Sequence, residues 1–151
     1  MDSRYVINNL DELFTPALVF YKEIIRQNNA EVIRLAGSPQ RLCPHVKTHK
    51  TREIAKMQLE LGITSHKCAT IAEAEMLASC AVPDVLLAYP LVGPNVRRLR
   101  ALAEKYPQVN FSVLCDHPET LAGLRQGWQG APKKLGVLLD VNVGHNRTGI
   151  A

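Results

Sequence analysis

The residues best suited to chemistry form one dense segment, Pro44-His45-Val46-Lys47-Thr48-His49-Lys50. Residues two apart on a strand share a face, so we expect His45, Lys47 and His49 to point the same way. Burial of a lysine inside a sheet would lower the pKa of its amine, which is the state that a Schiff-base lysine needs. A second interpretation is that Lys47 and Lys50 are strand-end lysines with their amines in water, and spacing alone favours it.

A shared metal ion does not fit this segment. His45 and His49 are four residues apart, which on a strand separates them by about 13 Å. A helix would bring them together, but Pro44 argues against a helix here. The sequence therefore predicts no metal site within this chain.

A second candidate segment runs from Asp140 to Gly149, where a buried strand passes into a polar loop punctuated by glycines. Folds with parallel strands place their sites at the carboxyl ends of the strands. Arg147 is the candidate binding residue in this loop. An ordinary turn between strand and helix, with Arg147 in solvent, explains the same residues equally well.

These segments lie in a chain that alternates strand and helix. Apolar runs predict strands at 17–20, 41–47, 63–68, 85–88, 109–114 and 135–141. Helical spacing, glycine stops and prolines in first turns predict helices at 21–36, 51–61, 70–79, from Pro94 and from about Pro118. Thr70 and Glu73 form a capping-box pattern at the start of the third helix.

The regular spacing of the strands indicates the architecture. Their starts are 22 to 26 residues apart, as in βα units that feed a parallel sheet. A (β/α)8 barrel and an open doubly wound sheet both fit, and the missing G-x-G-x-x-G after the first strand weakens the dinucleotide-binding form of the latter. A barrel needs about 250 residues, whereas this chain has 151. We therefore expect residues 1–151 to be one incomplete α/β barrel domain of about six units, from a longer protein.

Composition excludes several classes of function. Hydrophobic residues make up 46%, aromatic residues 5%, and the net charge is +4, so no stacking platform for nucleic acid is expected. There is no apolar run of about 18 residues and no secretory signal, which predicts a cytoplasmic protein without a membrane partner. The four cysteines form no C-x-x-C pair and are expected to be reduced thiols.

Residues 44–50 closely resemble the P-H-x-K-T-H-K segment of the D-threonine aldolase and D-serine dehydratase group. This group belongs to the alanine-racemase-like, fold type III, pyridoxal-phosphate enzymes. Further segments agree in the same order, so the resemblance covers about residues 15–150: Thr15–Leu18, Cys68–Glu75, Leu87–Pro94 and Asp140–Gly149.

The resemblance implies particular roles. Lys47 corresponds to the lysine that binds pyridoxal phosphate covalently, and Arg147 to the arginine at the cofactor's phenolic oxygen. It also places His45 and Tyr89 at the cofactor. Cys43 stands where the family has arginine, which puts the contact of that arginine in doubt. The implied fold is a TIM-type barrel with a C-terminal β-domain that this chain lacks.

The implied activity is lyase chemistry on a small D-3-hydroxy amino acid. Retro-aldol cleavage of a D-threonine-like substrate is the first expectation, and dehydration of D-serine is the alternative. A racemase or a non-catalytic cofactor-binding or interaction fragment is a further alternative. The K-A-N-A-Y-G-H segment of racemases is replaced here by Lys47-Thr48-His49-Lys50-Thr51. A divalent metal, zinc or manganese, would have its ligands beyond residue 151, and the whole protein is expected to be a homodimer.

Overall fold

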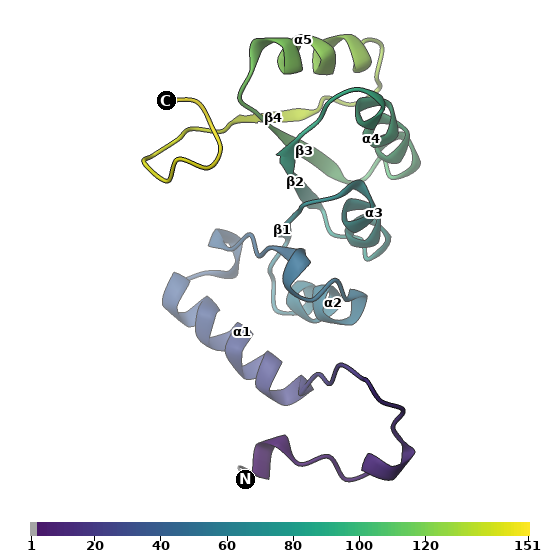
Figure 1. The fold of residues 1–151 in the computed structure, drawn as a ribbon, viewed down its shortest axis with the longest axis vertical. Coiled ribbons are helices and arrows are strands. Elements are labelled where there is room, and N and C mark those ends of the chain that lie inside the picture. Colours follow the sequence, from purple (N-terminus) through teal and green to yellow (C-terminus); the bar gives the residue numbers. More distant parts are fainter. Residues whose placement is uncertain (1–2) are drawn as a thin grey trace.

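The computed structural model describes residues 3–151 and contains one parallel sheet of four strands (Figure 1). The strands are β1 (Ser65–Cys68), β2 (Asp84–Pro90), β3 (Asn110–Cys115) and β4 (Gly136–Leu139). They lie side by side in chain order, β1-β2-β3-β4. This sequential, all-parallel order confirms the expectation of successive βα units.

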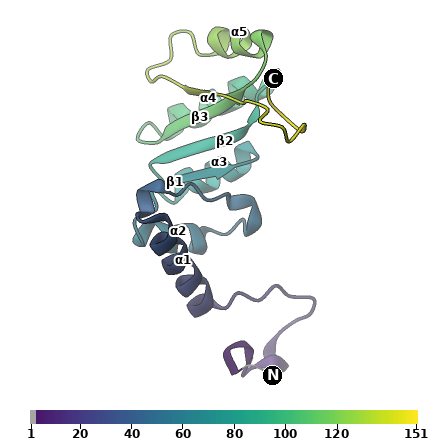
Figure 2. The ribbon, with the colours of Figure 1, turned by 90° about the vertical axis from the view of Figure 1, so that its left-hand side faces the viewer.

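Five α-helices accompany the sheet: α1 (Lys22–Ala36), α2 (Arg52–Glu60), α3 (Ile71–Ser79), α4 (Pro94–Lys105) and α5 (Pro118–Gly127). Helices α3 and α4 lie on the same face of the sheet, and α1 lies beyond the β1 end of the sheet (Figures 1 and 2). Short 3-10 turns occur at Ser3–Tyr5, Leu10–Glu12, Pro39–Arg41 and Val46–Thr48. Among residues 3–151, no helix has the length and apolar character that a membrane span requires.

Local signals explain where several helices begin. The Thr70 hydroxyl accepts a hydrogen bond from the Glu73 N–H at 3.1 Å, as the capping-box pattern predicts. Pro94 and Pro118 each occupy a first-turn position, where a missing N–H costs no helical bond. The His117 imidazole caps α5 by accepting from the Glu119 N–H at 3.2 Å.

The core fills the space between the sheet and its helices. On β2 and β3, Val85, Leu87 and Val113 are at most 1% exposed, and they share a cluster with Leu77 and Leu99 from α3 and α4. On β1, β2 and β3, alternate residues are buried against the helices, whereas the residues between them are half-buried or exposed. Within residues 3–151, no helix covers this second face (Figure 2).

The prediction of six strands is wrong at the first two. Residues 17–20 form no strand or helix, and Leu18 is 79% exposed. Residues 41–47 contribute only an isolated bridge, between His45 and Lys67. An apolar segment becomes a strand only where its backbone can hydrogen-bond to an adjacent strand. After His45, local hydrogen bonds to the backbone form a 3-10 turn in place of the second predicted strand.

Candidate functional site

Parallel strands bring their carboxyl ends to one edge of the sheet, and the candidate residues follow these ends. His45 bridges Lys67, which is one residue before the end of β1. The segment with Lys47 therefore lies at the β1 end of this edge. Tyr89 lies near the end of β2, and the loop with Arg147 follows β4 at the far end of the sheet, with β2 and β3 between.

Lys47 is held in a short, fixed turn rather than in a strand. The Lys67 N–H donates to the Pro44 carbonyl at 2.9 Å, and the Val46 side chain is fully buried. Lys47 itself is exposed. The expected strand at Lys47 is therefore wrong, because the His45 Nδ1 accepts the Lys47 N–H at 3.2 Å and replaces a ladder bond. The exposed side chain agrees with the interpretation that spacing alone favoured, an amine in water.

The strand alternation expected of His45, Lys47 and His49 does not apply, because Val46–Thr48 form a 3-10 turn with the two histidines at its ends. His49 accepts the Thr51 N–H on its Nδ1 at 3.0 Å and lines a hollow beside Ile54 and Gln58 of α2. Each imidazole thus accepts a backbone N–H on Nδ1, which leaves Nε2 to carry the proton of the neutral ring.

Burial lowers the pKa of both rings. For His45, burial is the main cause, and the nearby cations of Lys47 and Lys67 lower the pKa further, against a smaller opposite effect of Glu73. For His49, burial outweighs the hydrogen bond from Thr51, which acts in the opposite direction. The lowered pKa of each imidazole favours the neutral ring, and a neutral His45 presents an Nε2–H donor next to Lys47.

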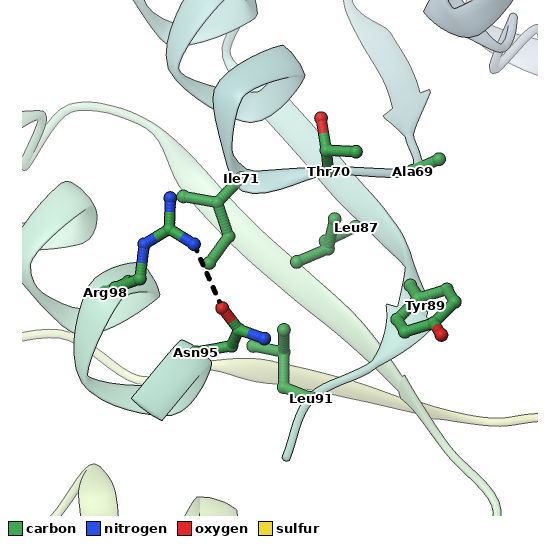
Figure 3. A pocket seen from close by; sticks show the side chains of 8 residues that line it. All are labelled: Ala69, Thr70, Ile71, Leu87, Tyr89, Leu91, Asn95 and Arg98. Atoms are coloured by element: carbon green, nitrogen blue, oxygen red, sulfur yellow. Dashed lines mark hydrogen bonds between the residues drawn. The ribbon is translucent and has the colours of Figure 1, made fainter. Parts of the chain in front are cut away.

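Tyr89 lies at a different part of the carboxyl edge of the sheet. It is 61% exposed and lines a hollow of about 350 Å³ between the starts of α3 and α4, with Thr70, Leu91 and Asn95. Figure 3 shows Arg98 on the same hollow, where its guanidinium donates to the Asn95 side-chain oxygen at 3.1 Å. No hydrogen bond or contact given by the structure joins Tyr89 to Lys47 within residues 3–151.

The loop with Arg147 has a defined shape. The Asn142 side-chain oxygen accepts the N–H groups of Gly144 and Asn146, both at 3.0 Å. Gly149 has a φ of +88°, and a β carbon there would lie 2.7 Å from the Asn142 nitrogen. The Arg147 side chain is exposed and makes no hydrogen bond or ion pair within the described residues, so its guanidinium can bind an added anion.

Two polar residues near this edge were not singled out as site residues from the sequence. Glu73, expected only as a helix cap, also lies 3.5 Å from the Lys50 amine. Burial raises the pKa of the Cys43 thiol, which the Lys67 cation lowers and Asp84 raises. For Glu73, the spacing from Thr70 was the only sequence signal. No sequence pattern indicates that Lys50 and Glu73, which are 23 residues apart, meet in the fold.

Residues 3–151 contain no group of three or more histidine, cysteine or acidic side chains that could hold a metal ion. All four cysteines are free thiols in this structure. The arrangement offers instead an exposed amine, a neutral imidazole, an aromatic ring and a free guanidinium along one edge of the sheet. These groups can bind an aldehyde and an anion.

Comparisons with known proteins find relatives of this chain. The chain is 32% identical over 110 residues to a D-threonine aldolase of Arthrobacter sp., covering 73% of this chain and 28% of the relative. It is 29% identical to a D-serine dehydratase of Dictyostelium discoideum, covering 95% of this chain and 37% of the relative. The chain thus spans well under half of the length of these relatives.

Solved structures give the same result. The crystal structure of a D-threonine aldolase from Filomicrobium marinum superposes with a TM-score of 0.83 at 29% identity, covering 93% of this chain and 38% of that one. A family profile described as "Alanine racemase, N-terminal domain" matches residues 22–151. The four-stranded sheet is therefore part of such a domain, and the chain belongs to the alanine racemase N-terminal domain family.

Proposed function

We propose that this chain is the N-terminal part of a pyridoxal-phosphate-dependent lyase that cleaves D-3-hydroxy amino acids. The observation that carries the proposal is the exposed Lys47 amine, which sits in a fixed turn at the carboxyl edge of the sheet. D-threonine-like substrates come first, since a D-threonine aldolase is among the relatives in both sequence and structure. The products would be glycine and an aldehyde.

The residues present fit the aldehyde and ring portions of this cofactor. The Lys47 amine has no hydrogen bond or ion pair within residues 3–151, and a free primary amine is the group that reacts with an aldehyde. The unpaired Arg147 guanidinium suits an anionic phenolic oxygen. The exposed ring of Tyr89 offers an apolar contact surface at the same edge.

Pyridoxal phosphate, when bound, takes up the electrons released from a bond at the substrate's α-carbon. Within this chain, Lys47 would hold the cofactor covalently and Arg147 would donate a hydrogen bond to its phenolic oxygen. His45, neutral and with Nε2 protonated, would donate a hydrogen bond beside Lys47. In retro-aldol cleavage the 3-hydroxyl loses its proton and the Cα–Cβ bond breaks, so that D-threonine yields glycine and acetaldehyde with no further reactant.

Dehydration of D-serine is the second candidate. Two D-serine dehydratases, from Dictyostelium discoideum and Saccharomyces cerevisiae, match 95% and 99% of this chain, a larger share than the aldolase of Arthrobacter sp. does. In this reaction the α-proton leaves first and the hydroxyl follows as water, and hydrolysis of the resulting aminoacrylate by one water gives pyruvate and ammonia. The Lys47 amine would be the base that takes the α-proton.

The test uses the full-length protein with pyridoxal phosphate and the D and L forms of threonine and serine. We expect glycine and acetaldehyde from D-threonine, whereas pyruvate from D-serine would favour the second candidate. Lys47→Ala should abolish turnover, whereas Lys56→Ala, a change of an exposed lysine on α2, should not. Borohydride reduction followed by peptide mapping should label Lys47. No product from any of the four substrates, or labelling only at another lysine, would overturn the proposal.

A further inference from the structure

A buried carboxylate lies next to the segment that carries Lys47. The Glu73 side chain is only 8% exposed, and acidic residues are seldom buried without partners. One of its oxygens, Oε2, accepts the Ala69 N–H at 2.8 Å. The other, Oε1, lies 3.5 Å from the Lys50 amine. Glu73 therefore does more than cap its own helix, because it also reaches the segment containing Lys47.

Lys50, which makes this contact, has an unusual backbone conformation. Its φ of +52° is in the left-handed region, which residues with a β carbon seldom adopt. A short hydrogen bond of 2.7 Å from the Lys50 N–H to the Val46 carbonyl closes the turn. The chain thus turns back tightly between Val46 and Lys50, and Lys47 lies inside this turn.

The turn is fixed at three points. The Lys67 N–H holds Pro44 at its start, the buried Val46 side chain anchors its middle, and the Lys50–Glu73 ion pair fixes its end. Among these three points, only the ion pair can be removed by substitution to an uncharged residue that leaves the core and the contact with β1 unchanged. We propose that Glu73 is a positioning residue, which holds the Lys47 amine in place through its ion pair with Lys50.

This inference rests on the proposed function, since it names what places the cofactor-binding lysine. Two consequences separate it from a purely structural role. Glutamine also accepts the Ala69 N–H in a capping box, so Glu73→Gln keeps the cap and removes only the charge. Without the carboxylate charge, the unpaired Lys50 cation should raise the positive charge near Lys47. The turn should also become free to move, so that the amines of Lys47 and Lys50 become more similar in reactivity.

The experiment measures the rate at which acetic anhydride modifies each amine of the full-length protein, as a function of pH and without cofactor. In Glu73→Gln we expect the Lys50 rate at pH 8 to rise by roughly threefold, the size expected for a partly exposed ion pair. The Lys47 rate–pH profile should shift to lower pH. Lys50→Gln, which removes the cation and leaves the Glu73 carboxylate unpaired, should shift the Lys47 profile to higher pH instead, whereas Lys50→Arg, which keeps the cation, should leave it as in the wild type.

Glu75→Gln is the matched control, since Glu75 lies on the same helix and pairs with Lys105 at 2.7 Å. It should leave the Lys47 profile unchanged. The double variant Glu73→Gln/Lys50→Gln should shift this profile no further than either single change does. A Lys47 profile that is unaffected by Glu73→Gln, or equally affected by Glu75→Gln, would overturn the positioning role.

A second readout keeps this inference separate from the proposed function. With pyridoxal phosphate and borohydride, the wild type should be labelled mainly at Lys47, and Glu73→Gln should increase the share of label at Lys50 by roughly threefold. A wild type without label at Lys47 would contradict the proposed function. The acetylation profiles would still decide whether Glu73 controls the Lys47 amine.

Discussion

His66 should make this chain sensitive to acid, and the size of the effect follows from its surroundings. The ring is fully buried in β1, its Nε2 donates to Gln58 Oε1 at 3.0 Å, and Nδ1 has no partner among the described residues. Burial, with a smaller effect of the nearby His49, lowers the pKa of His66 from 6.5 to about 4. The unfolded chain binds this proton below about pH 6.5 and the folded chain does not, so stability is lost as pH falls from about 6.5 to about 4.

At about 1.4 kcal/mol for each pH unit, this difference corresponds to about 3 kcal/mol of unfolding free energy. Urea unfolding between pH 7.5 and pH 4, followed by the fluorescence of the single tryptophan, Trp128, measures it. His66→Gln keeps an amide donor for Gln58 but cannot titrate, so its stability should fall less on acidification. His145→Gln, in an exposed loop, should behave as the wild type does. Equal losses in wild type and His66→Gln would refute the reasoning.

Three further outcomes are expected. Thr70→Ala removes the hydroxyl that accepts the Glu73 N–H and should lower the unfolding free energy by about 1 kcal/mol in urea titrations; no change would show that the cap is redundant. Arg147→Ala in the full-length protein should shift the pH titration of the bound cofactor's absorption band and reduce turnover, with an unchanged circular dichroism spectrum; an unaltered titration and rate would contradict its role. The isolated chain should self-associate through β4, where Leu139 is 62% exposed, because an open apolar strand edge invites pairing; Leu139→Lys should reduce association in sedimentation, and a monomeric wild type would contradict this.

Much of the fold could be predicted because its signals are local. Helix α1 ends at Ala36, before the glycine that the sequence marked as a stop, and α3 spans almost the residues that its capping box indicated. The last four predicted strands lie within about two residues of those in the structure. Apolar runs, caps and proline positions act within a few residues of one another, so periodicity is enough to place them.

The failures occurred where a distant strand partner or a side-chain bond to the backbone decides the outcome. Residues 17–20 have a strand-like composition but no ladder to join, and the bond from the Lys47 N–H to His45 Nδ1 ends the next run early. The site segments could be selected from residue types and from a family resemblance. The contact of Lys50 with Glu73 could not, since it depends on a left-handed residue and on two turns that meet only after folding.

The open face of the sheet also differs from its covered face in chemistry. Lys67, Leu86, Ser112 and Gly136 occupy one register across the four strands, and strand alternation turns Lys67 away from the buried His66. A β carbon at Gly136 would collide with the Ser112 hydroxyl, so the absence of a side chain there gives this hydroxyl its space. Burying a row that contains a cation and a hydroxyl under an apolar layer costs free energy. Such a row suits a sheet face that contacts polar groups. The covered face supplies the rigid core, whereas Lys67 and Ser112 lie on the open face, whose strands end at the carboxyl edge next to the turn that holds Lys47.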